Sequence, residues 1–104
     1  MIRINVVKKN NIIESVTFKG HANYDDYGKD IVCAAVSATY LCTVNAIFSL
    51  NNNSIDVVNE DNLQVIKVLE FDNITNSLLN NMINCLESLQ EQYPKNINLD
   101  KEEK

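Results

Sequence analysis

The chain has 104 residues, of which 45% are apolar and one is proline, a size that suits a single domain with one hydrophobic core. The formal net charge of −5 argues against direct binding of nucleic acid, which needs a basic surface. The same charge is compatible with a basic protein or peptide as substrate, or with solubility alone.

Two strands are predicted at the start of the chain. Residues 1–7 carry Ile2, Ile4 and Val6 on one face, and residues 12–19 form a second strand after a polar turn. This alternating start lacks the charged segment and apolar block of a signal peptide. No stretch approaches the roughly 20 apolar residues that span a bilayer, so we expect a cytoplasmic protein with no membrane partner.

A loop and a helix follow the first hairpin. Residues 20–30 contain both glycines and the only histidine of the chain, and they show no periodicity. Long loops of this kind in small domains are often functional. Residues 31–50 are apolar and free of Gly and Pro, which predicts a largely buried helix with Asp30 as its N-cap.

The second half repeats a hairpin and a helix. Residues 55–58 and 63–69 predict two strands, and Asp72 or Asn73 caps the helix that runs to Tyr93 and Pro94. The apolar stripe of this helix is predicted to contain Ile74, Leu78, Met82, Cys85 or Leu86, and Leu89. Residues 95–104 are mostly charged and are predicted to be a frayed tail.

These elements predict an α+β fold made of one two-layer domain at residues 1–94, followed by the tail at 95–104. The predicted order is β-β-α-β-β-α, with a four-stranded, mostly antiparallel sheet and two helices. Cys33 and Cys42 lie about 13 Å apart along one helix and on roughly opposite sides, so they share neither a metal nor a disulfide. Cys42 and Cys85 are expected to be core thiols, and we expect no metal and no cofactor.

Cys33 is the candidate nucleophile. If Asp30 is the N-cap, Cys33 is the third residue of the helix, where free N–H groups and the helix dipole stabilise a thiolate. His21 is the only imidazole, and the intervening loop is long enough to bring it back to the thiol. A thiol and an imidazole are the minimum for covalent acyl transfer. A buried core thiol and a surface histidine remain the alternatives.

The neighbouring polar residues have two interpretations each. Asp30 either orients His21 or only caps the helix. Ser37, one turn after Cys33, either donates a hydrogen bond in the site or bonds back to its own helix. Tyr24 and Tyr27 either line the pocket or pack within the loop.

The run Gly20-His21-Ala22, Tyr24, and Tyr27 to Ala38 closely resembles the ribosomal-processing cysteine protease family, Prp. The resemblance implies a homodimeric cysteine endopeptidase with Cys33 as nucleophile and His21 as base. It implies that Gly20, Asp30 and Ser37 shape the site, and that the loop closes on the substrate. The implied substrate is a bacterial large-subunit ribosomal protein, number twenty-seven, which loses a short hydrophobic N-terminal extension cut after an aromatic residue.

One residue departs from the family pattern, and two other functions remain open. Asn23 stands where a small residue, often Gly, is expected, and Asn tolerates positive φ well. The start of the 31–50 helix is the expected source of N–H donors to an oxyanion. The alternatives are a non-catalytic module that binds a ribosomal protein during assembly, and a thiol peroxidase or redox sensor based on Cys33.

Overall fold

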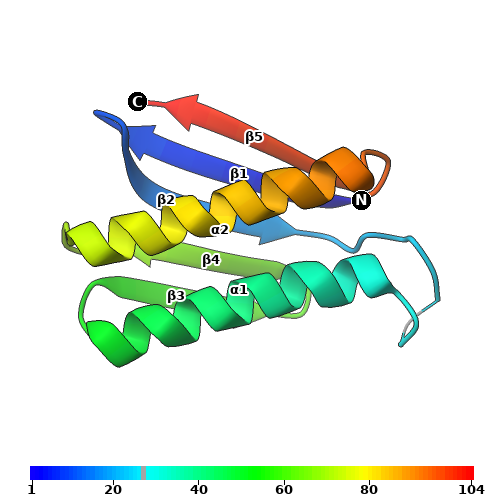
Figure 1. Ribbon diagram of the computed structural model, residues 1–104, viewed down its shortest axis with the longest axis horizontal. Helices are drawn as coiled ribbons and strands as arrows, with labels where there is room; N and C mark the ends of the chain where they lie inside the picture. The colour runs from blue at the N-terminus through cyan, green and yellow to red at the C-terminus, as the bar shows by residue number, and fades with distance from the viewer. Residues whose placement is uncertain (27) are drawn as a thin grey trace.

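The computed structural model describes residues 1–26 and 28–104. In chain order the elements are β1 (Ile2–Lys9), β2 (Ile12–Lys19), α1 (Ile31–Leu50), β3 (Ile55–Glu60), β4 (Leu63–Val68), α2 (Asn73–Gln92) and β5 (Ile97–Glu103) (Figure 1). The two hairpins and both helices lie within two residues of their predicted bounds. The α+β class is therefore confirmed, whereas the predicted order β-β-α-β-β-α is wrong, because a fifth strand follows the second helix.

The sheet has five strands in the order β3-β4-β2-β1-β5, not four. The prediction of a frayed tail at 95–104 is wrong, because β5 pairs in parallel with β1 along its whole length. Its charged residues misled the sequence interpretation. On an edge strand, charged side chains point to solvent while the backbone pairs, and they discourage pairing with other chains. Only Ile97 of β5 is fully buried.

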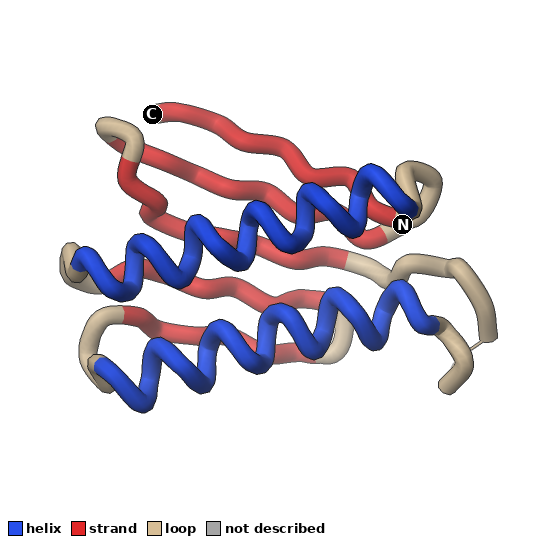
Figure 2. The backbone as a smooth tube through the Cα atoms, viewed as in Figure 1, coloured by secondary structure: helices blue, strands red, loops and turns tan. Residues whose placement is uncertain are grey.

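The remaining strand pairs are antiparallel, so the sheet is mostly antiparallel as predicted. Ile4 lies opposite Phe18, and Val6 lies opposite Val16, so alternate residues of β1 and β2 face the core. Both helices cover this one face, which makes a two-layer molecule (Figure 2). The ring of Tyr40 on α1 meets Phe18 on β2 edge to face, with ring centroids 5.4 Å apart.

Helix α1 is buried along one stripe only, so the prediction of a largely buried helix is wrong. The buried residues are Val32, Val36, Tyr40, Val44 and Ile47. Apolar side chains outside this stripe are exposed, with Ile31 56% and Leu41 49% accessible. The expectation that no segment is apolar enough for a membrane span is also wrong for α1, by length and composition. A helix that packs its apolar face on a sheet has the same composition.

The stripe of α2 is rotated by about one residue from the prediction. Its buried residues are Thr75, Leu79, Met82, Ile83 and Leu86. Ile74 and Cys85 are exposed, and so is Cys42 on α1. The prediction that Cys42 and Cys85 are core thiols is therefore wrong. Apolar residues surround both in the sequence, but several of those neighbours also face outward.

One end of the molecule gathers the segments that build the site. The loop after β2, the N-terminus of α1 and the turn between α2 and β5 all lie there (Figure 1). The turn between β3 and β4 reaches the same end, since the backbone N–H of Gly20 donates to the Asn62 carbonyl oxygen at 3.1 Å.

Candidate active site

Gly20 starts the loop in a conformation that only glycine adopts readily. Its φ is +85°, and a Cβ built on it would lie 2.7 Å from the Met1 carbonyl oxygen. The strand therefore turns sharply into the loop while its backbone touches the chain start. Gly20 also lines the cavity described below, as a site-shaping residue should.

Asp30 ends the loop and is the N-cap of α1, which confirms the predicted cap. Its Oδ1 accepts the N–H groups of Val32 and Cys33 at 3.0 and 2.9 Å. Its Oδ2 accepts the N–H of Tyr24 at 3.0 Å. One carboxylate thus joins the helix start to the middle of the loop. Both of its oxygens face backbone donors, which favours the capping role over orientation of His21.

The electrostatic state of Asp30 follows from these contacts. Partial burial by itself raises the pKa of the carboxyl group. The backbone N–H groups outweigh that effect and hold its pKa below the usual value, Cys33 and Tyr24 contributing most, followed by Asp25 and Val32. Asp30 is therefore fully ionised at neutral pH.

Cys33 lies at the third helical position, half-buried, with its sulfur facing a cavity of about 560 Å³. The backbone N–H of Ala22 donates to this sulfur at 3.3 Å. This hydrogen bond joins the loop to the start of α1 at the sulfur itself. The thiol therefore lies at the edge of the core, where the cavity reaches it, and is not sealed inside.

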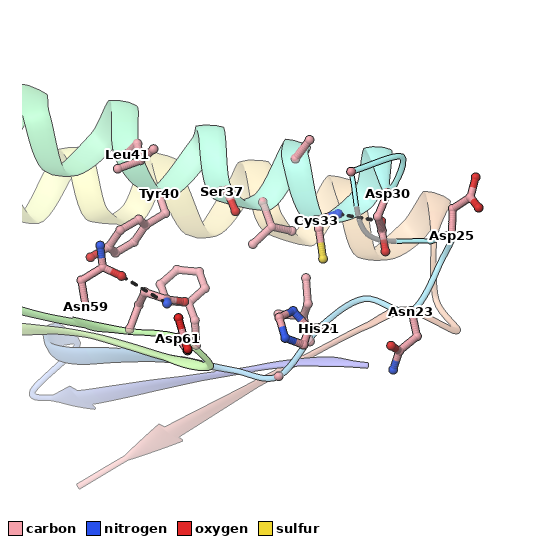
Figure 3. Close-up of a pocket in the computed structure, with 17 residues that line it drawn as sticks. His21, Asn23, Asp25, Asp30, Cys33, Ser37, Tyr40, Leu41, Asn59 and Asp61 are labelled. Carbon is pink, nitrogen blue, oxygen red and sulfur yellow. Dashed lines mark hydrogen bonds between the residues drawn. The ribbon is translucent and has the colours of Figure 1, made fainter.

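His21 lines the same cavity from the loop side and is exposed to solvent. Figure 3 shows its ring below the Cys33 sulfur, on the opposite wall of the space beneath α1. Among the described residues, no hydrogen bond joins the ring to the sulfur. Such contacts often tighten only when substrate binds.

The other predicted site residues divide into two groups. Ser37 lines the cavity one turn after Cys33 (Figure 3). Tyr24 does not line it, because its ring packs edge to face on Tyr93 at 5.4 Å. Asn23 adopts a φ of 55°, the left-handed conformation that a glycine would also take. Tyr27 lies outside the described residues.

The expected oxyanion donors at the helix start are already occupied. The N–H groups of Val32 and Cys33 donate to the Asp30 side chain, and that of Ala34 donates to the Asp30 carbonyl oxygen. The expectation is therefore wrong for these three groups. The backbone donor that does reach the sulfur belongs to Ala22, in the loop.

Sequence reasoning missed the far half of the cavity. Its floor includes Phe18 and Tyr40, and burial raises the pKa of the Tyr40 phenol, which stays neutral. Its rim includes Asn59, Asp61 and Gln64 from the β3–β4 hairpin. Gln64 is fixed there, because its amide donates to the Glu60 carbonyl oxygen at 2.8 Å. No local pattern marks these residues, since the register of β4 against β2 brings them to the site.

The arrangement can perform one kind of chemistry well. A thiol with a backbone donor, an imidazole across a cavity and an apolar floor suit acyl transfer from a peptide to sulfur. Among the described residues, no three His, Cys, Asp or Glu side chains cluster closely enough to hold a metal ion. The fold and the site together define a cysteine hydrolase with room for a peptide.

Comparison with known proteins identifies the family. Residues 1–98 match the family described as cysteine protease Prp. The chain is 33% identical over 90 residues to the ribosomal processing cysteine protease Prp of Staphylococcus aureus, covering 84% of this chain and 85% of that one. The chain belongs to the cysteine protease Prp family, and it is a cysteine peptidase.

Solved structures agree with this assignment. The fold is similar to that of S. aureus Prp in complex with a covalently linked product peptide, with a TM-score of 0.94 and 29% identity over 98% of this chain and all of that one. The complex of S. aureus Prp with a substrate peptide gives a TM-score of 0.86, with the same identity and coverage.

Proposed function

We propose that this peptidase removes a short hydrophobic N-terminal extension from a bacterial large-subunit ribosomal protein, number twenty-seven, as a step in ribosome assembly. The observation that carries the proposal is the Cys33 sulfur, which opens on a peptide-sized cavity lined also by His21. The S. aureus relative named above is a ribosomal processing cysteine protease, and it has been solved with a substrate peptide and with a covalently linked product peptide.

The shape and charge of the cavity support this class of substrate. Its apolar lining by Phe18, Val36 and Leu41 suits an aromatic side chain beside the scissile bond. Its rim carries Asp25 and Asp61, and the whole chain has a net charge of −5. Opposite charge speeds the encounter with a basic protein, such as one that binds ribosomal RNA.

The reaction proceeds by attack of sulfur on carbon. His21 takes the proton of the Cys33 thiol, and the thiolate adds to the scissile carbonyl carbon, whose π electrons move to the oxygen. The Ala22 nitrogen lies 3.3 Å from the sulfur, which makes its N–H the candidate donor to that oxyanion. The oxyanion collapses, the C–N bond breaks, and His21 gives its proton to the leaving amine. Water, deprotonated by His21, then hydrolyses the thioester and restores the thiol.

The proposal includes a cytoplasmic homodimer. The described cysteines are all unpaired, as thiols are in a reducing compartment. The outer face of α1 offers a second copy an exposed apolar side chain, Ile31. Light scattering tests the dimer by measuring the mass in solution. The wild type should have twice the mass of one chain, and Ile31→Glu should have a lower mass.

Intact-mass spectrometry tests the main proposal. The wild type is mixed with the extended ribosomal protein and with a matched form that lacks the extension. We expect loss of the extension after the aromatic residue, no change in the shorter form, and no cleavage by Cys33→Ala with unchanged circular dichroism. Tight binding of the extended protein without any cleavage would favour the non-catalytic binding module.

A further inference from the structure

The side chain of Asn96 reaches the loop that carries His21. Asn96 lies in the turn between α2 and β5, and its Nδ2 donates to the Ala22 carbonyl oxygen at 2.9 Å. The N–H of the same Ala22 donates to the Cys33 sulfur at 3.3 Å. Resting on the proposed function, we propose that Asn96 is a positioning residue, which aims the Ala22 N–H at the sulfur and at the oxyanion that forms beside it.

Ala22 is held at three points, which leaves its N–H little freedom of direction. The whole residue is buried with 1% exposure, its carbonyl oxygen accepts from Asn96, and its N–H donates to the sulfur. The Ala22 N–H lies in the peptide plane before its α-carbon, and the carbonyl oxygen lies in the plane after it. The buried side chain fixes the α-carbon that the two planes share, the bond to the sulfur holds the first plane, and the bond to Asn96 fixes the rotation of the second. Loss of the Asn96 amide would release that rotation and remove the donor from the carbonyl oxygen.

Asn96 is itself fixed to the frame of the molecule. Its backbone N–H donates to the Tyr93 carbonyl oxygen at 3.0 Å, and its own carbonyl oxygen accepts the N–H of Ile2 at 2.9 Å. The next residue, Ile97, is 1% exposed and begins β5. The amide donor therefore stands on a turn joined to both α2 and β1, the kind of rigid support that holds a reactive geometry.

The same turn contacts the loop a second time, on the other side of Asn23. The ring of Tyr93 packs on that of Tyr24, and the Tyr24 N–H donates to Asp30. These contacts hold the loop against α1 in general. The Asn96 contact differs from them because it acts on the residue whose N–H touches the sulfur.

The first experiment compares Asn96→Ala with the wild type on a peptide that carries the proposed leader. Removal of a direct oxyanion donor lowers kcat about 100- to 1,000-fold, so loosening that donor should lower kcat about 10- to 100-fold. KM should change little, since Asn96 is not among the residues that line the cavity. Alkylation of Cys33 by iodoacetamide at pH 7 should also slow, while the exposed Cys42 and Cys85 react at unchanged rates in the same molecule.

A second variant, Asn96→Asp, separates positioning from packing. It preserves the size of the side chain, but the ionised carboxylate cannot donate to the Ala22 carbonyl oxygen, whereas the protonated acid can. The ratio of its kcat/KM to that of the wild type should therefore rise as the pH is lowered from 8 to 5. A purely structural role would leave this ratio flat.

Asn98 provides the matched control, because it lies two residues further along and its amide donates to Asp100 instead. Asn98→Ala and Asn98→Asp should behave as the wild type. If the wild type cleaves and the Asn96 variants match the Asn98 variants in kcat and in Cys33 alkylation, the positioning role is overturned and the proposed function stands. If the wild type cleaves nothing, the proposed function fails, and the alkylation contrast alone decides the role of Asn96.

Discussion

The two helices of this protein begin in the same way and yet only one of them begins at a reactive site. Asp30 caps α1 and Asp72 caps α2; the Asp30 carboxylate accepts two N–H groups of the first turn and the Asp72 carboxylate accepts one. The third helical residue is Cys33 in α1 and Thr75 in α2. Thr75 is 2% exposed and its hydroxyl lies 2.7 Å from that of Ser54, whereas Cys33 faces a cavity.

The difference comes from what precedes each helix. Residues 69–72 join β4 to α2 directly, and the Asp72 carboxylate bonds to Asn51 at the end of α1. Before α1 an eleven-residue loop turns at Gly20 and returns to Asp30, which leaves a hollow beneath the helix start. A capped helix N-terminus is thus a common structural feature. The loop that leaves it open to a ligand makes it a site.

The largest effect outside the nucleophile should come from the base. We expect His21→Ala to lower kcat for the leader peptide about 100- to 10,000-fold, because the thiol loses its proton acceptor and the leaving amine its donor. Lys29→Ala, in the same exposed loop, should retain cleavage within about twofold. Steady-state kinetics measure both, and equal activity of the two variants would remove His21 from the mechanism.

Replacing each capping aspartate by asparagine should lower kcat at Asp30 but not at Asp72. In Asp30→Asn the single amide oxygen can still cap α1, but the amide N–H₂ replaces the oxygen that accepts the Tyr24 N–H. We expect kcat to fall about tenfold as the loop loosens, with a small loss of thermal stability. Asp72→Asn is the counterpart at α2 and should leave kcat unchanged. Kinetics and thermal melts of the pair would contradict the account if both variants lost activity equally.

The third residue of α2 should matter for stability alone. Thr75→Val removes a buried hydroxyl that bonds to Ser54 and Asp72, which should lower the free energy of unfolding by roughly 1–3 kcal/mol. Cleavage at a temperature where the variant is folded should match the wild type. Urea unfolding followed by peptide kinetics checks both statements, and a loss of activity in the folded variant would speak against the contrast between the helices.

The smallest effect is a dependence of stability on acid. Hydrogen bonds hold the pKa of both caps below the usual value; for Asp72 the Asn51 amide contributes most, followed by the Ile74 N–H. Groups with lowered pKa stabilise the fold above their unfolded pKa of about 3.9, and this contribution is lost as the pH falls through the folded pKa. Melting temperatures should therefore decline below pH 4, and decline less in the Asp30→Asn and Asp72→Asn double variant. An identical decline would show that other groups control the acid limit.

Local patterns sufficed to predict most of the fold. Alternation gave β1 and β2, and the Asp caps gave the starts of both helices, because these signals depend on residues close together in the chain. Strand β5 was missed because a charged edge strand carries no apolar period, and its pairing with β1 depends on residues more than ninety positions away. The exposed Cys42 and Cys85 were misplaced, since an apolar neighbourhood in the sequence does not say which face is covered.

The site was predictable in its motif and not in its supports. Cys33, His21 and Asp30 lie within one segment, and the structure brings all three to one cavity. Asn96 meets Ala22 across 74 residues, and the hairpin residues Asn59 and Asp61 reach the cavity through strand pairing. Contacts of this kind depend on the sheet topology, which no local pattern in the sequence indicates. The N–H groups at the helix start are occupied, which only the hydrogen bonds to the Asp30 carboxylate in the structure show.

Capture of the acyl-enzyme tests the central claim, that the Cys33 sulfur forms a bond with the substrate carbonyl. The wild type is mixed with the leader peptide, quenched in acid within seconds and digested for mass spectrometry. The account predicts the mass of the N-terminal fragment as a thioester on the peptide that contains Cys33, and its absence in Cys33→Ala. An adduct on Cys42 or Cys85, or cleavage that persists in Cys33→Ala, would contradict it.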